Sequence, residues 1–211
     1  MRILIVAALL LLSACETAYY DAMEKVGFHK RDILIDRIEE AQEAQEDGQE
    51  QFKDALEQFR AVVNFDGGEL ETVYNQLNDE YEDSVAAAEE ITGRIDAVDS
   101  VANALFDEWQ TELGEYSNAN LRRDSERQLK ATQRKYQQLI SSMRRAESSI
   151  QPVLASLKDN VLYLKHNLNA RAISSLKGEL DTVNRDVSSL LDAMQRSIDE
   201  SNKFINDIKT G

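Results

Sequence analysis

Apolar side chains recur every three or four residues along almost the whole chain past residue 30. Four such stretches can be followed, over 35–63, 70–116, 129–168 and 173–208. A seven-residue apolar repeat is typical of helices that pack as left-handed coiled coils. The pattern therefore predicts an all-α fold: an elongated antiparallel helical bundle, or coiled coil, of about four long helices.

The breaks between these stretches carry the residues of turns and helix caps. The run Asp66-Gly67-Gly68-Glu69 predicts a capping box that starts the second helix. Residues 116–120 offer Ser and Asn caps for the third helix, and Asn167 or Asn169 can cap the fourth. Connections this short predict antiparallel neighbours.

The third stretch contains one irregularity. Its apolar step lengthens beside Pro152, the single proline of the chain. A proline inside a helix removes a backbone hydrogen bond, and a change of step unwinds a coiled coil locally. We expect a bend in the third helix there.

The first stretch places glutamines where apolar residues would be expected. We call Gln42, Gln45 and Gln49 the polar waist; alanines and Gly48 lie beside them. Folding about Asp66 sets the waist opposite other small residues, so the first two helices could approach closely. Two interpretations stay open: a polar site around Gln45 that binds a small molecule, or polar core residues that fix the register of the helices at some cost in stability.

The N-terminus has the pattern of an export signal. Ten apolar residues follow Arg2, which is too short for the roughly 20 residues of a membrane-spanning helix. The next residues, Leu12-Ser13-Ala14-Cys15, resemble the lipobox of bacterial lipoproteins. That resemblance implies cleavage before Cys15, the only cysteine, and attachment of lipid to its sulfur and to its new amino group.

This resemblance divides the chain into three parts. Residues 1–14 are the expected lipoprotein signal peptide, 15–30 a lipid-anchored N-terminal segment, and 31–209 the helical bundle domain. Within the second part, residues 18–26 are expected to form a short helix ended by Gly27, which lengthens the first long helix. Lipoproteins with Asp after the cysteine tend to stay in the inner membrane; here the residue is Glu16, which favours the outer membrane.

Charge excludes some partners. The formal net charge is −15, which argues against nucleic acid, since phosphates require a basic surface. The same balance argues against electrostatic adhesion to anionic lipid. The expected attachment to the membrane is therefore the N-terminal lipid anchor alone.

Charge is also unevenly distributed. Residues 32–116 carry 25 acidic and 4 basic side chains, whereas residues 120–170 carry 10 basic and 4 acidic ones. We therefore expect the basic third helix to form ion pairs with the acidic second helix. Folding the chain back about Asn118 places Arg144 near Glu89 and Glu90.

The sequence offers no motif for catalysis. His29 and His166, the only histidines, are expected at opposite ends of the bundle, so they cannot share a metal. There is no Glu-x-x-His pair, haem-attachment motif, glycine-rich phosphate loop or nucleophile elbow. We expect no enzyme activity, no cofactor, no metal and no catalytic residues.

The turns suggest where a partner could bind. With the anchor at one end, the turns near residues 64–68 and 165–169 should meet at the far end. We define the tip as the mixed aromatic and polar group found there: Phe65, Asp66, His166, Asn167 and Asn169. An exposed aromatic side chain can anchor a protein contact, although Phe65 could equally cap the core. The binding surface could also be the acidic shaft.

Four segments resemble a known family. They read "AYYDAMEKVGFHKRDILIDRIEEAQEAQE", "FDGGELETVY", "LFDEWQTELGEYSNANLRR" and "LKHNLNARAI", and the chain is similar through them to the bacterial lipoproteins of domain of unknown function 2959. The resemblance implies a helical envelope lipoprotein and no assigned activity. The expected function is thus a non-enzymatic scaffold, spacer or protein-interaction module in the periplasm, with an envelope protein as partner.

Overall fold

The apolar repeat folds into long helices. A computed structural model describes residues 29–67 and 69–210. Its helices are α2 (Lys30–Val63), α3 (Leu70–Glu112), α4 (Ala119–Ser148), α5 (Ile150–Lys165) and α6 (Ala170–Thr210). The 43 residues of α3 correspond to about 65 Å at 1.5 Å per residue. The prediction of an all-α bundle is confirmed.

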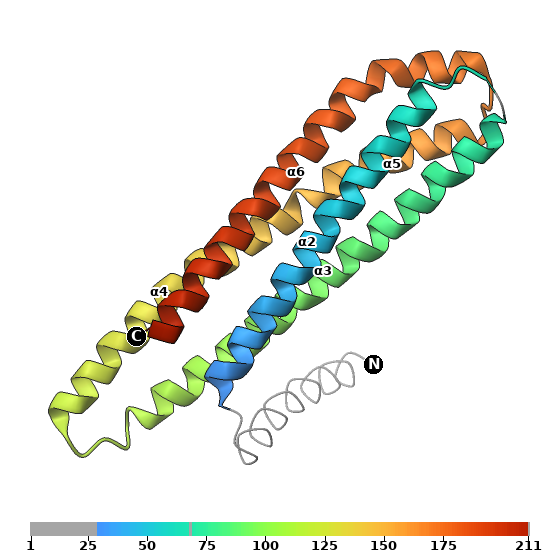
Figure 1. Cartoon of the computed structure of the whole chain (residues 1–211). Coiled ribbons are helices and arrows are strands. Elements are labelled where there is room, and N and C mark those ends of the chain that lie inside the picture. Colours follow the sequence, from blue (N-terminus) through green and yellow to red (C-terminus); the bar gives the residue numbers. More distant parts are fainter. Residues whose placement is uncertain (1–28, 68, 211) are drawn as a thin grey trace, which may run out of the picture.

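The helices form an elongated antiparallel bundle with its turns at the two ends (Figure 1). α2 packs against α3 and α6, and the α4–α5 pair packs against the same two helices. The α4–α5 pair therefore takes the fourth position of a four-helix bundle. Its core is a continuous apolar column with contributions from every helix, among them Phe52, Phe59, Ile91, Ile95, Leu139, Met143, Leu157, Val187 and Leu190.

Where a bend of the third helix was expected, the helix is interrupted for one residue, Ser149, between α4 and α5. Pro152 has no N–H to donate to the carbonyl of Ser148, so the helical ladder cannot continue through this turn. The hydroxyls of Ser148 and Ser149 both donate to the carbonyl of Arg145, at 2.8 and 2.9 Å. The same carbonyl also accepts the backbone N–H of Ser149 at 3.2 Å, so the two hydroxyls add to a backbone bond at the end of α4.

Two of the expected caps are present and one is not. Asn118 Oδ1 accepts from the backbone N–H groups of Asn120 and Leu121. Asn169 Oδ1 accepts from the N–H groups of Arg171 and Ala172. The prediction of a capping box at Asp66 was wrong. α3 begins later, with Glu69 as its N-cap, and the Glu69 side chain makes no capping hydrogen bond.

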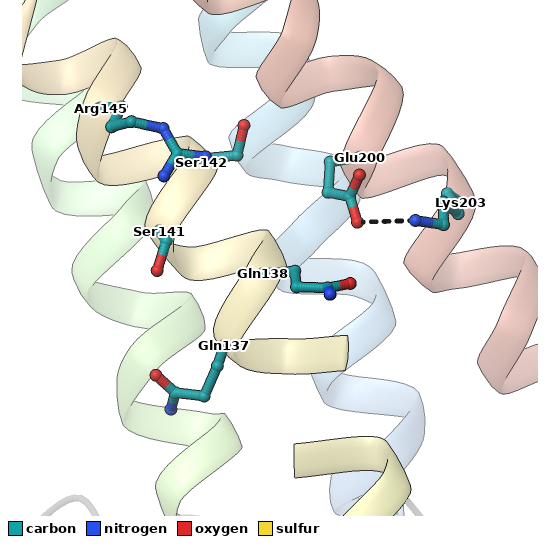
Figure 2. Close-up of a pocket in the computed structure, with 7 residues that line it drawn as sticks. All are labelled: Gln137, Gln138, Ser141, Ser142, Arg145, Glu200 and Lys203. Carbon is teal, nitrogen blue, oxygen red and sulfur yellow. Dashed lines mark hydrogen bonds and ion pairs between the residues drawn. The ribbon is translucent and has the colours of Figure 1, made fainter. Parts of the chain in front are cut away.

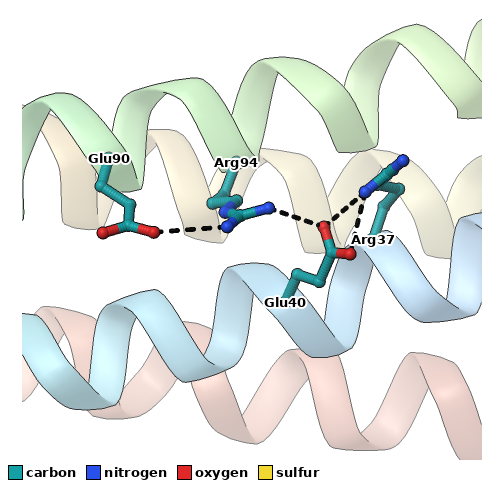
Figure 3. Close-up of polar contacts among 4 residues, drawn as sticks. All are labelled: Arg37, Glu40, Glu90 and Arg94. Atoms are coloured by element: carbon teal, nitrogen blue, oxygen red, sulfur yellow. Dashed lines mark hydrogen bonds and ion pairs between the residues drawn. The ribbon is translucent and has the colours of Figure 1, made fainter.

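Ion pairs connect α2 to α3 on the surface. Arg94 donates to Glu40 of α2 at 2.9 Å and to Glu90 of its own helix at 3.3 Å, and Arg37 also binds Glu40 (Figure 3). Because α2 and α3 are both strongly acidic, this shared arginine offsets repulsion between them. Exposed pairs of this kind are worth about 0.2–1 kcal/mol, so they set register more than stability.

The expected pairing of the third helix with the second occurs in a different register. Arg144 binds Asp96 of α3 at 2.6 Å and Glu147 at 3.0 Å, rather than Glu89 and Glu90. Glu89 and Glu90 precede Asp96 in α3, so counting back from a turn at Asn118 placed the partners of Arg144 too far from that turn.

Candidate functional site

The tip residues come together at one end of the bundle. The turn between α2 and α3 and the turn between α5 and α6 lie at the same end (Figure 1). α2 begins at Lys30, at the opposite end, so a chain anchored through its N-terminus would hold the tip away from the anchor. Cys15 itself lies outside the described residues, as do the signal segment and the expected short helix over 18–26.

Several tip residues serve the turns themselves. Asn169 caps α6, and Asn167 Nδ2 donates to the carbonyl of Tyr163 at 2.9 Å. His166 is the C-cap of α5 and is exposed. Phe65 is half-buried and Asp66 is exposed. His166, Asp66 and part of Phe65 thus remain as surface that another molecule could contact.

The sequence interpretation missed the apolar part of this surface. Leu162, Tyr163 and Leu168 are 48%, 39% and 41% exposed. Counting the apolar repeat assigned Leu168 to the core, but α5 ends at Lys165, which leaves Leu168 in the turn. The early end of the helix could have been read from the Asn-rich run that follows it.

Gln42 and Gln45 of the polar waist are buried, as their positions in the repeat predict, and Gln49 is half-buried. Gln45 is fully buried, and within the described part of the chain neither its Nε2 nor its Oε1 has a hydrogen-bond partner. The Nε2 of Gln49 and the Oγ of Ser197 are likewise buried without a partner there. Each such atom costs about 1–3 kcal/mol relative to a satisfied one, so the waist reduces the stability of the core.

Contacts on either side of Gln45 locate its neighbours. Gln42 Nε2 donates to the carbonyl of Ile198 at 3.2 Å, and Gly48 lies against Met194 and Ile91. Gln45 and Ser197 must therefore occupy the same level of the α2–α6 pair. A Cβ added at Gly48 would sit 2.7 Å from Ile91 Cδ1, so the space left by this glycine is filled by the Ile91 side chain and not by one of the small residues that the sequence placed there.

A polar hollow of about 520 Å³ lies between α4 and α6 (Figure 2). Gln137, Gln138, Ser141, Ser142 and Arg145 line it from α4, opposite the Glu200–Lys203 ion pair of α6. Among the described residues that line this hollow there is no histidine or cysteine, so it supplies no Ser–His or Cys–His pair for nucleophilic catalysis.

The described residues were also searched for metal-binding groups and for membrane-spanning helices. The described residues contain no group of three or more His, Cys, Asp or Glu side chains placed to hold a metal ion. Over the same residues, every helix is too short or too polar to cross a bilayer.

One buried titratable group lies in the core. The Tyr136 ring is 1% exposed, and its hydroxyl donates to Asp99 Oδ1 at 2.5 Å. Burial raises the pKa of Tyr136, and the hydrogen bond to Asp99 raises it further. This tyrosine is therefore a neutral structural donor at physiological pH.

Comparison with known protein families identifies the family of this chain. The model of the family described as protein of unknown function (DUF2959) matches residues 19–208, which is most of the chain. The chain belongs to this family. A search of curated proteins found no match. The DUF2959 match covers α2 to α5 and α6 as far as Ile208, and it also includes ten residues, 19–28, that precede the described part.

Proposed function

We propose that this protein is a lipid-anchored lipoprotein of the Gram-negative envelope that acts without catalysis, as a scaffold, spacer or protein-interaction module in the periplasm. Cys15 carries the anchor, and Glu16 favours the outer membrane. The helical bundle extends from the anchor, and its tip contacts an envelope protein partner.

The exposed apolar residues at the far end of the rod carry this proposal. Leu162, Tyr163 and Leu168 lie within seven residues of each other and are each more than a third exposed. Exposed apolar clusters rimmed by polar residues are typical of protein-contact surfaces. The exposed Tyr163 lies at the same end of the bundle as the exposed His166 and Asp66. This end therefore offers both an apolar anchor and polar contacts.

The anchor can be tested by replacing its nucleophile. Cys15→Ser should abolish incorporation of a fatty-acid probe, because a serine hydroxyl does not replace the thiol that accepts the lipid. The protein should then leave the membrane fraction, while Ser13→Ala should leave both readouts unchanged. Label retained by Cys15→Ser would show that Cys15 is not the lipidated residue.

A second function is favoured by the polar waist. The buried amide of Gln45, with neither polar atom paired in the described structure, could bind a small molecule that supplies a donor and an acceptor. A thermal-shift screen of small polar compounds tests this function. A stabilising compound whose effect disappears in Gln45→Leu and persists in Gln138→Leu, in the surface hollow, would support it; effects unchanged by Gln45→Leu would contradict it.

A further inference from the structure

The hairpin of α5 and the start of α6 differs in charge from the rest of the chain. Residues 150–178 carry four basic side chains and one acidic side chain, Asp159, which gives a formal charge of +3 in a chain of net charge −15. The basic residues are Lys158, Lys165, Arg171 and Lys177. The turn of this hairpin belongs to the tip (Figure 1). A positively charged surface is therefore found at the end of an acidic rod.

The four basic side chains of the hairpin are exposed. None of them pairs with a carboxylate in the part of the chain that the structure describes. In contrast, Lys135 and Arg144 of α4 pair with Asp207 of α6 and Asp96 of α3, at 2.9 and 2.6 Å. The charges of α4 thus connect helices of the bundle, whereas those of the hairpin face solvent.

Arg171 lies where its charge opposes the stability of its own helix. It falls in the first turn of α6, which begins at Ala170 and has no acidic residue in that turn. The positive end of the helix dipole disfavours a cation there. Lys165, in the last turn of α5, is favoured by the same effect, so Arg171 is the more informative position. A negatively charged partner would offset the cost of its charge.

Exposed apolar residues lie among these charges. On α5, Leu162 follows Lys158 by four residues and precedes Lys165 by three, so the three side chains share one face of the helix. Leu162 is 48% exposed. This face of α5 therefore places a large apolar side chain between two cations.

Tyr163 extends this surface to α6. Its hydroxyl donates to Ser175 Oγ at 3.4 Å, and Ser175 in turn donates to the carbonyl of Arg171 at 3.2 Å. Leu168 is exposed in the turn that joins the two helices. We define the basic face by the residues of this continuous surface: Lys158, Leu162, Tyr163, Lys165, Leu168 and Arg171.

We propose that the basic face binds an acidic, partly apolar peptide segment of an envelope protein. The carboxylates of the segment pair with the three cations, and its apolar side chains cover Leu162 and Tyr163. Charges of one sign at an interface attract a partner of the opposite sign and disfavour others. Tyr and Arg are enriched at protein contacts, which favours a protein segment over a lipid surface. This inference rests on the proposed function, because it assigns a chemistry to the partner of the tip.

Cross-linking in intact cells tests the charge of the partner. A photo-crosslinker replaces the exposed His166 in the full chain, which leaves the basic face intact. Lys158→Glu with Arg171→Glu should lower the captured yield per chain by about tenfold or more, because like charges then face each other. Arg134→Glu with Arg196→Glu is the matched control. It makes the same change of net charge at exposed residues without an ion pair in the described structure, and should leave the yield unchanged.

The same experiment separates this inference from the proposed function. Equal yields from the two double variants would overturn the acidic partner and leave the tip as a contact surface. No capture by the unsubstituted basic face would contradict the tip contact itself, and this inference with it. Lys158→Gln with Arg171→Gln removes the charges without reversing them, and should give an intermediate yield.

Mass spectrometry of the captured product identifies the chemistry of the partner. The cross-linked peptide should contain more Asp and Glu than Lys and Arg. A neutral or basic peptide, or an adduct of lipid or glycan, would overturn the proposal. A peptide from residues 32–116 of this chain would overturn it in favour of a second copy, bound through its acidic α2 and α3.

Discussion

Tyr136 makes contacts both in the core and with a half-buried carboxylate. Its ring packs edge-on against Phe106 of α3 and Phe204 of α6, at centroid distances of 5.4 and 6.2 Å. Its hydroxyl reaches the half-buried carboxylate of Asp99. One side chain on α4 therefore joins three helices through apolar and polar contacts together.

The raised pKa of Tyr136 predicts a loss of stability at alkaline pH. The unfolded chain releases the tyrosine proton near pH 10, whereas the folded protein holds it to higher pH. The stabilisation is complete below about pH 10 and is lost as the pH rises further. Denaturant unfolding of the wild type from pH 8 to pH 11 should show this fall in free energy.

Tyr136→Phe should flatten that dependence, and should cost about 1.5–3 kcal/mol at neutral pH because a hydrogen bond to a carboxylate is lost. Tyr163→Phe, at an exposed position, is the matched control and should behave like the wild type. If Tyr136→Phe and the wild type lose stability equally above pH 10, the interpretation of Tyr136 is wrong.

At the scale of helices, capping decides where elements begin. The Asn118 side chain accepts from Asn120 N at 2.9 Å and from Leu121 N at 3.3 Å. Glu69, the N-cap of α3, makes no side-chain capping bond. Asn118→Ala should therefore lower the free energy of unfolding by about 1 kcal/mol.

The matched variant is Glu69→Ala, which removes an exposed side chain from an N-cap without a bond and should change stability by less than about 0.5 kcal/mol. Urea unfolding followed by circular dichroism measures both variants. A larger loss for Glu69→Ala than for Asn118→Ala would mean that α3 is capped by its side chain after all.

The presence of four long apolar-repeat segments that form helices was predictable from sequence because the repeat is long and regular. The residues at which the helices begin and end were less predictable: Asp66 has the sequence of a cap, yet α3 begins at Leu70. Tyr116 and Leu168 continue the apolar spacing but lie beyond helix ends and are exposed. Spacing alone does not show where the backbone leaves the helix, so these two surface residues were assigned to the core.

The burial of Gln45 in the polar waist was predictable, but its lack of hydrogen-bond partners was not. The position of Gln45 in the repeat places it in the core, and it is fully buried. Whether its amide finds a partner depends on the rotation of α6 against α2, which brings Ile198 to Gln42 and leaves Gln45 unpaired within the described structure. Sequence spacing does not fix that rotation.

At the scale of the whole molecule, charge divides the bundle into sides. α2 and α3 are acidic, and basic residues of α4 contact α3 through the Arg144–Asp96 pair and α6 through the Lys135–Asp207 pair. The net charge of −15 keeps the shaft polar and strongly hydrated, which disfavours nonspecific association. The exposed apolar residues are instead found near the turns.

This distribution makes the tip the expected contact surface. A photo-crosslinker in place of Tyr163 tests it in intact cells, with the same crosslinker in place of Glu46, an exposed residue of the shaft, as the matched control. The account predicts that Tyr163 captures a discrete envelope protein and that Glu46 does not. Capture from Glu46 alone would contradict it, because the binding surface would then be the acidic shaft.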